Sequence, residues 1–221
     1  MTYFTIKEHV TNLATLCGRK GTDIHLVAVS KSRNIEEMKS VYEAGGREFG
    51  ESRVQEVVEK KKHMPENCRW HFIGTVQSNK IAKCIGQFCL IHSVDHSALA
   101  KKLSRASQEK NSMTSILLQV NTSGESAKHG LSKEQWEKEL DSLHLLSHLR
   151  IEGLMTMAPL TEDVGVIRKC FRELYELREA WRKEMKEPLH FTHLSMGMSQ
   201  DYPIAIEEGA TILRIGSAIF S

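Results

Sequence analysis

The sequence lacks a strong charge imbalance, because 30 Lys and Arg residues stand against 28 Asp and Glu residues, for a net charge of +2. Proteins that bind nucleic acid broadly usually carry a basic patch or stripe, and this composition does not supply one. The one basic run is Lys60-Lys61-Lys62, which we interpret as the solvated end of a helix. We therefore expect no nucleic-acid partner.

Long apolar runs and metal-binding motifs are also missing. No segment approaches the roughly 18 apolar residues of a membrane-spanning helix, and residues 1–20 lack the apolar block and cleavage site of a signal peptide. The five cysteines are scattered and include no Cys-x-x-Cys pair, which is typical of reduced thiols in a cytoplasmic protein. The 11 histidines form no His-Glu-x-x-His motif. We expect neither a membrane association nor a metal site.

What the sequence does contain is a regular alternation of strand-like and helix-like segments. A first helix is predicted over 5–18, and strands are predicted near 25–30, 48–51, 70–73, 88–94, 115–120, 151–157, 190–194 and 211–215. Such alternation is typical of parallel strands joined by crossover helices. Eight units in 221 residues favour one closed (β/α)8 barrel over an open doubly wound sheet, and no Gly-x-Gly-x-x-Gly follows the first strand. We predict an α/β fold: a single TIM-type barrel domain, 1–221, with an extra N-terminal helix.

Helix starts are marked by capping patterns. Asn34 with Glu37, and Ser132 with Gln135, have the spacing of capping boxes, and Asp95 is predicted to cap the helix that runs to about 109.

One of the predicted strands ends on a lysine. The apolar run 26–29 is followed directly by Ser30 and Lys31. At the end of a buried strand a lysine is partly withdrawn from water, which favours the neutral amine that attacks carbonyl compounds. The alternative is a surface lysine that closes a strand. Lys80 and Lys128 are competing amines, but only Lys31 directly follows an apolar strand that points it into the barrel mouth.

Glycine and serine gather after the last two strands, where (β/α)8 barrels usually bind phosphate. The segments 195–199 and Gly216-Ser217 lie there, and such residues offer backbone N–H groups and hydroxyl groups to an anion. Each cluster alone could be an ordinary turn. Combined with an amine that forms Schiff bases, they describe a site for pyridoxal 5'-phosphate (PLP).

Arg214 lies in the apolar eighth strand, with its head in the barrel mouth or in a buried ion pair. Near a pyridine ring the guanidinium acts only as a hydrogen-bond donor.

The chain also carries eight short motifs in order: Ala28-Val29-Ser30-Lys31, Phe49-Gly50-Glu51, His71-Phe72-Ile73-Gly74, Gln77-Ser78-Asn79-Lys80, Leu118-Gln119-Val120-Asn121, Gly153-Leu154-Met155-Thr156-Met157, Leu194-Ser195-Met196-Gly197-Met198-Ser199 and Arg214-Ile215-Gly216-Ser217-Ala218-Ile219-Phe220. Together they resemble the YggS/PROSC family of PLP homeostasis proteins, which are similar to the N-terminal barrel domain of alanine racemase. The resemblance runs from about residue 5 to the last residue, and its combined motifs are highly specific.

The resemblance implies that PLP is bound as an aldimine to Lys31. It also implies phosphate contacts from Ser199, Gly216 and Ser217, and it places Arg214 against the ring nitrogen.

Three positions depart from the family pattern. The family usually has asparagine at Ser52, near the cofactor ring, so a contact to the ring or to the lysine differs here. It usually has Gly-Pro where this chain has Gly74-Thr75, and a final glycine where this chain has Ser221; both differences look tolerable.

The resemblance implies a carrier or regulator in intracellular PLP homeostasis without robust catalysis. Two alternatives stay open: a PLP-dependent amino-acid enzyme such as a racemase, and a barrel enzyme in which Lys31 forms a Schiff base with a phosphorylated metabolite. We expect a monomer that binds PLP and passes it to PLP-dependent apo-enzymes. Weak catalysis is expected because Arg214 would leave the pyridine nitrogen unprotonated. The racemases take a second base from an additional domain, and we expect none here, since only Ser217 to Ser221 follow the last strand.

Overall fold

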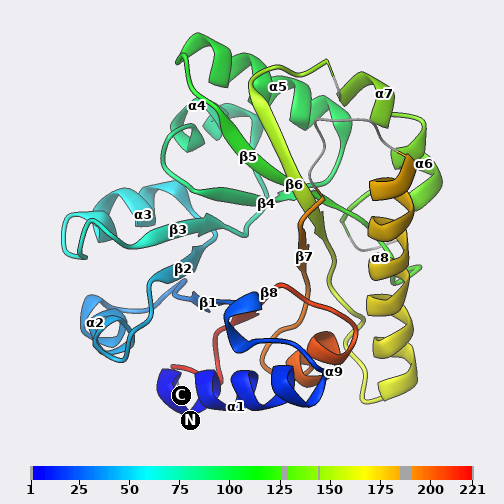
Figure 1. Cartoon of the computed structure of the whole chain (residues 1–221). Helices are drawn as coiled ribbons and strands as arrows, with labels where there is room; N and C mark the ends of the chain where they lie inside the picture. The colour runs from blue at the N-terminus through cyan, green and yellow to red at the C-terminus, as the bar shows by residue number, and fades with distance from the viewer. Residues whose placement is uncertain (1, 126–128, 144, 185–190, 221) are drawn as a thin grey trace.

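The structure, a computed structural model, describes residues 2–125, 129–143, 145–184 and 191–220. Its centre is a closed barrel of eight parallel strands, in which each strand pairs with the next and the last pairs with the first (Figure 1). The strands are β1 His25–Val29, β2 Glu48–Glu51, β3 Arg69–Phe72, β4 Leu90–Val94, β5 Thr114–Gln119, β6 Leu149–Met155, β7 His193–Ser195 and β8 Ile212–Ile215. The predicted (β/α)8 TIM-type barrel is confirmed.

Helices surround the barrel and connect consecutive strands (Figure 1). The extra N-terminal helix is α1 (Tyr3–Leu16), which buries Ile6, Val10 and Ala14 and contacts α9. The other helical segments are η1 Gly21–Asp23, α2 Ile35–Glu43, α3 Val54–Lys61, η2 Ser78–Lys80, α4 Ile81–Cys84, α5 Ser97–Glu109, α6 Lys133–Glu137, α7 Leu140–Leu143, α8 Val164–Glu184 and α9 Tyr202–Glu207.

Local sequence signals explain some of the helix starts. Both predicted capping boxes are confirmed: the side chain of Asn34 accepts from the Glu37 backbone N–H at 2.8 Å, and that of Ser132 accepts from Gln135 at 3.3 Å. The predicted cap at Asp95 is wrong. α5 begins at Ser97, and its N-cap position is His96, whose side chain makes no capping bond. The Asp95 carboxylate instead accepts a hydrogen bond from the His96 ring at 2.6 Å.

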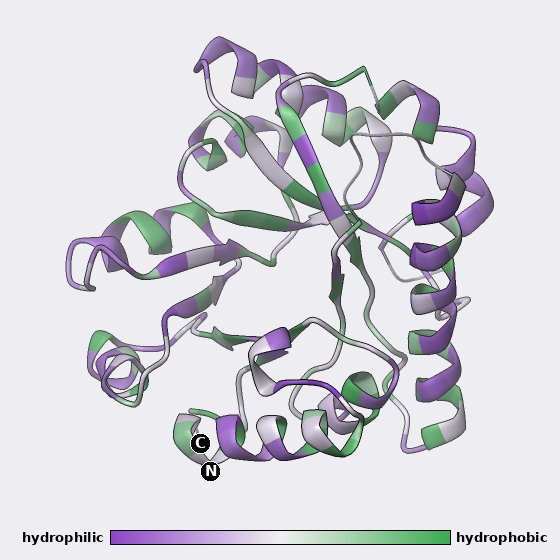
Figure 2. Ribbon diagram, viewed as in Figure 1, coloured by the Kyte–Doolittle hydropathy of each residue, from purple (hydrophilic) through white to green (hydrophobic). Residues whose placement is uncertain are grey.

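The barrel wall separates two apolar clusters. The larger lies between the strands and the helices, and the smaller fills the barrel interior with Val27, Leu90, Leu117, Met155 and Ile212. In Figure 2 the strands β1, β4 and β8 are mostly green, while the surrounding helices alternate purple with green, as expected when parallel strands are buried on both faces. The interior is not apolar throughout, however, because it also buries histidines and an arginine whose contacts are described below.

One glycine permits the close approach of β6 and β7. The pairing of β5 with β6 shifts register between Ile116 and Leu117, which leaves an extra residue on β6 just before Gly153. Gly153 has a φ of +155°, and a Cβ there would lie 2.0 Å from the carbonyl oxygen of His193. A side chain at this position therefore meets fixed backbone in the neighbouring strand.

Replacing Gly153 with alanine should lower the free energy of unfolding by about 3 kcal/mol or more, because it combines an unfavourable φ with overpacking against backbone. Gly86 is the matched control: its φ is +79°, but nothing lies within 4 Å of its would-be Cβ. The Gly86→Ala variant should lose only about 1–2 kcal/mol. Urea denaturation of both variants measures the difference, and equal losses would contradict the steric explanation.

Candidate functional site

The carboxyl ends of β1 and β8 lie side by side, so residues from the two ends of the sequence meet. In this pair Val27 lies opposite Arg214. Beyond the strands, the Arg33 guanidinium donates to the backbone carbonyl oxygen of Phe220 at 3.0 Å, which ties the loop after β1 to the turn after β8. A Cβ on Gly216 would lie 3.3 Å from the Cβ of Val29. Gly216 therefore lies close to the backbone that leads into Lys31.

Lys31 is exposed, so the expectation that it is withdrawn from water is wrong. Ser30, directly after β1, is still buried, and the chain then turns at once, with the Arg33 N–H donating to the Ser30 carbonyl oxygen at 3.0 Å. Ser32, with a φ of 60°, belongs to this turn. Burial ends at the strand because the turn lifts the next residue to the surface of the barrel end.

A buried ion pair lies directly behind this turn. The Lys60 ammonium donates to the Ser30 carbonyl oxygen and to Oε1 of Glu51, both at 2.7 Å, and the Ser30 hydroxyl donates to the same Glu51 oxygen at 2.6 Å. Glu51 is fully buried and Lys60 is 8% exposed. Burial raises the pKa of Glu51, while hydrogen bonds from Lys60 and Ser30 act in the opposite direction. This network fixes the peptide group that joins Ser30 to Lys31.

The interpretation of Lys60-Lys61-Lys62 as a solvated helix end is therefore wrong for its first residue. Only Lys62 is fully exposed; Lys61 is half-buried and donates to the Gln87 carbonyl oxygen at 2.6 Å. The signal in the sequence was the spacing of Val54, Val57 and Lys60, which puts the lysine on the buried stripe of α3.

The predicted phosphate residues come together at the ends of β7 and β8. The Ser199 hydroxyl accepts a hydrogen bond from the Ala218 backbone N–H at 3.2 Å, which joins the two glycine–serine segments. Within the described residues, the backbone N–H groups of Gly216 and Ser217 have no hydrogen-bond acceptor. Two neighbouring N–H groups beside a hydroxyl fit the oxygens of a phosphate group.

Arg214 is buried in the barrel interior, 5% exposed, with its head at the carboxyl end. Its guanidinium donates to the Ser195 hydroxyl at 2.5 Å and to the Thr156 carbonyl oxygen at 2.9 Å, residues at the ends of β7 and β6. The sequence left two positions open for the arginine head: the barrel mouth or a buried ion pair. In the structure the head lies toward the mouth, and it makes no ion pair among the described residues. Burial lowers the pKa of Arg214 to about 10, so the group stays positively charged near neutral pH.

Comparison with known proteins agrees with this arrangement. The family "Alanine racemase, N-terminal domain" matches residues 5–221. A pyridoxal phosphate homeostasis protein from Synechocystis is 42% identical over 199 residues, covering 89% of this chain and 90% of the relative. The solved structure of PipY from Synechococcus elongatus with PLP bound is 35% identical, with a TM-score of 0.84, covering 95% of this chain and 98% of PipY.

The chain belongs to the pyridoxal phosphate homeostasis protein family.

A more distant relative shares the fold alone. Alanine racemase from Clostridium difficile is 14% identical, with a TM-score of 0.75, and the match covers 93% of this chain and 56% of the racemase. The barrel of this family member thus corresponds to one part of a larger enzyme.

Two further predicted positions lie around the same end of the barrel. Ser52 is half-buried after β2, and a Cβ on Gly74 would lie 2.5 Å from the Ser52 carbonyl oxygen, so the loop after β3 packs tightly on it. Lys80, a competing amine, is half-buried in η2 after β3. The other competing amine, Lys128, and the C-terminal Ser221 lie outside the described residues.

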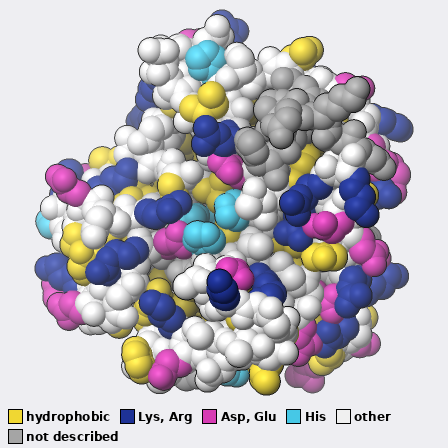
Figure 3. Space-filling view, viewed as in Figure 1, with side chains coloured by type: hydrophobic (Ala, Val, Ile, Leu, Met, Phe, Trp, Pro, Cys, Tyr) yellow, Lys and Arg dark blue, Asp and Glu magenta, His cyan; other side chains and the backbone are white. Residues whose placement is uncertain are grey.

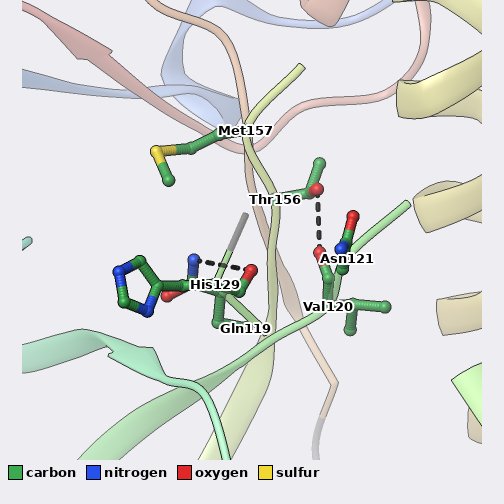
Figure 4. A pocket seen from close by; sticks show the side chains of 6 residues that line it. All are labelled: Gln119, Val120, Asn121, His129, Thr156 and Met157. Carbon is green, nitrogen blue, oxygen red and sulfur yellow. Dashed lines mark hydrogen bonds between the residues drawn. The ribbon is translucent and has the colours of Figure 1, made fainter. Parts of the chain in front are cut away.

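Neither of two hollows in the described surface competes with this site. Figure 4 shows the one between the ends of β5 and β6, lined by Gln119, Val120, Asn121, His129, Thr156 and Met157, which leaves no room for a water molecule. The other, of about 550 Å³, lies beside the amino ends of β7 and β8. Its arginines are engaged already: Arg172 binds Glu208, and Arg19 donates to two backbone carbonyl groups.

Two further features of the described residues concern membranes and metal ions. No helix there combines the length and the apolar character needed to cross a membrane. No cluster of three or more His, Cys, Asp or Glu side chains there could hold a metal ion.

The Lys60→Met variant should be destabilised by about 3–5 kcal/mol, because it leaves the buried Glu51 carboxylate without its counter-charge. Combining it with Glu51→Leu should restore much of that loss, since both charges are then gone. Lys62→Met is the control on the same helix, where the exposed pair with Glu59 contributes at most about 1 kcal/mol. Chemical denaturation measures all three, and a Lys60→Met variant as stable as Lys62→Met would contradict the role of the pair.

Proposed function

We propose that this protein binds PLP as a Schiff base on Lys31 and acts in intracellular PLP homeostasis as a carrier or regulator of the cofactor. The observation that carries the proposal is the meeting of three features at one barrel end. These are the exposed Lys31 amine, the Gly216 and Ser217 N–H groups beside Ser199, which have no acceptor among the described residues, and the buried Arg214 cation. The names of relatives at 34–42% identity support the same role.

Each residue has a specific part in this proposal. Lys31 would hold the aldehyde carbon covalently, and its exposure leaves the amine accessible to incoming cofactor. Ser199, Gly216 and Ser217 would bind the phosphate. Arg214 would donate to the ring nitrogen. Ser52 would lie near the ring, where its hydroxyl is shorter than the asparagine that the family usually has.

The charge on Arg214 supports a weak catalyst. PLP supplies an electron sink when it is bound, and the sink works best when an acidic group protonates the ring nitrogen. A guanidinium only donates hydrogen bonds and keeps its proton near neutral pH. A nitrogen beside Arg214 would therefore stay an unprotonated acceptor, which suits storage and exchange of the cofactor better than turnover of amino acids.

The oligomeric state, the compartment and the acceptors of the cofactor belong to the same proposal. We propose that residues 1–221 act as one PLP-binding domain, as a monomer in the cytoplasm, that passes cofactor to PLP-dependent apo-enzymes. The scattered cysteines form no disulfide among the described residues, which supports the reducing compartment.

Borohydride reduction of the PLP-loaded protein, followed by peptide mapping, should find the cofactor on Lys31. The Lys31→Ala variant should lose the Schiff-base absorbance while keeping weaker, reversible PLP binding, because the phosphate contacts remain. Lys80→Ala is the matched control and should keep the wild-type spectrum. Modification mainly of Lys80 or Lys128 would show that the nucleophile is assigned wrongly.

When the PLP-loaded protein is incubated with L-alanine in deuterated water, we expect little exchange of the α-hydrogen. We also expect no multiple-turnover racemisation of the alanine. The expected rate is low because the ring nitrogen stays unprotonated. NMR of the α-proton and chiral chromatography measure both reactions. Rapid multiple-turnover exchange would replace the carrier proposal with an amino-acid enzyme such as a racemase. A protein that binds no PLP but forms a borohydride-sensitive adduct with phosphorylated sugars would favour the metabolite enzyme.

A further inference from the structure

A chain of polar side chains crosses the barrel interior below Arg214, and the proposed PLP site does not use it. The Arg214 guanidinium donates to the Ser195 hydroxyl at 2.5 Å, and that hydroxyl lies 2.8 Å from Nδ1 of His92. Nε2 of His92 then lies 2.9 Å from Nδ1 of His71. Ser195 and His92 are completely buried, and His71 is 2% exposed.

The direction of these hydrogen bonds follows from the arginine. A guanidinium cannot accept, so the Ser195 oxygen accepts from Arg214 and its single proton is left for the next partner. The His92 ring is the one other group within hydrogen-bond distance of that hydroxyl among the described residues, so the hydroxyl donates to Nδ1 of His92. A neutral His92 then carries its proton on Nε2 and donates to Nδ1 of His71.

The far end of the chain faces a carboxylate. By the same reasoning His71 carries its proton on Nε2, an atom that is buried without a hydrogen-bond partner among the described residues. That nitrogen lies 3.9 Å from Oε1 of Glu48 on β2. Each N–H or O–H in the row therefore points from the cation at the barrel mouth toward the anion at the amino end.

Both rings stay neutral under physiological conditions. Burial lowers the pKa of His71 to about 4, with Glu48 acting in the opposite direction, and burial places the pKa of His92 well below its ordinary value. His25, Arg69 and His193 surround the Glu48 end from β1, β3 and β7, and Arg214 lies at the other end. Figure 3 shows histidine, acidic and basic side chains together near the centre of the face in view.

We propose that Ser195, His92 and His71 are positioning residues for Arg214: a one-way hydrogen-bond chain that fixes the guanidinium in the barrel mouth and sets one tautomer on each histidine. None of the three is assigned a contact with PLP. The effect on PLP rests on the proposed function, because it acts through the Arg214 contact to the ring. The tautomers themselves do not depend on PLP.

The first test uses the protein without PLP. Nitrogen-15 NMR of the histidine rings at pH 7 should show His92 and His71 as neutral rings protonated on Nε2. In the Ser195→Ala variant, Arg214 no longer determines the proton positions on the two histidine rings, and each ring should become a mixture of tautomers. The control is Ile212→Val, which alters a neighbouring interior side chain outside the chain of hydrogen bonds and should keep the wild-type pattern. An Nδ1-protonated or charged His92 or His71 in the wild type would overturn the proposed direction.

The second test measures PLP affinity in two substitutions at one position. His92→Leu removes the acceptor for Ser195 and should weaken PLP binding about tenfold and shift the absorbance of the bound cofactor. His92→Asn keeps an acceptor near the position of Nδ1 and should stay within about threefold of the wild type. Thermal unfolding confirms that each variant is folded. A folded His92→Leu variant with wild-type affinity and spectrum would overturn the positioning role. A wild type that binds no PLP would instead refute the proposed function, and the NMR result would still decide whether the chain exists.

Discussion

The site depends on the pairing of β1 with β8, which closes the barrel. The two strands are separated by most of the sequence, yet their pairing puts Val27 opposite Arg214 and brings the turn after β8 to the base of Lys31. A closed sheet has no free edge, so its strands hold one another in register. That register is what sets an amine, a set of N–H donors and a buried cation at one end of the molecule.

Buried charge is the second constraint on this end of the barrel. Lys60 and Glu51 lie behind the Lys31 turn, and Arg214 lies inside the wall. Removing such groups from water costs several kcal/mol per ion unless other polar groups surround them. Here Ser30 and Ser195 and two backbone carbonyl groups supply those contacts. The polar groups that stabilise the charges also restrict where the backbone and the guanidinium can lie, which a site for a small rigid cofactor requires.

The relation to alanine racemase separates fold from function. At 14% identity the shared barrel shows a common architecture and nothing about activity. Curated relatives at 34–42% identity are named for PLP homeostasis, and the proposed role follows them.

The sequence by itself determined the architecture and the positions of the predicted site residues along the chain. Strand and helix periods, the Asn34 and Ser132 capping boxes, and the glycine–serine segments are local signals, because they depend on residues within a few positions of one another. The motifs also identified the family, since eight short matches in order rarely occur together by chance.

Only the tertiary structure decided which side chains are buried and which meet across the barrel. Lys31 is exposed and Lys60 is buried, the reverse of the prediction, because exposure depends on the turn after β1 and on the packing of α3 against β2. The hydrogen-bonded row from Arg214 to His71 joins four strands, linking β7 and β8 to β3 and β4, which lie far away in the sequence. No local pattern encodes such a row, because it exists only when the closed barrel turns those side chains toward a common interior.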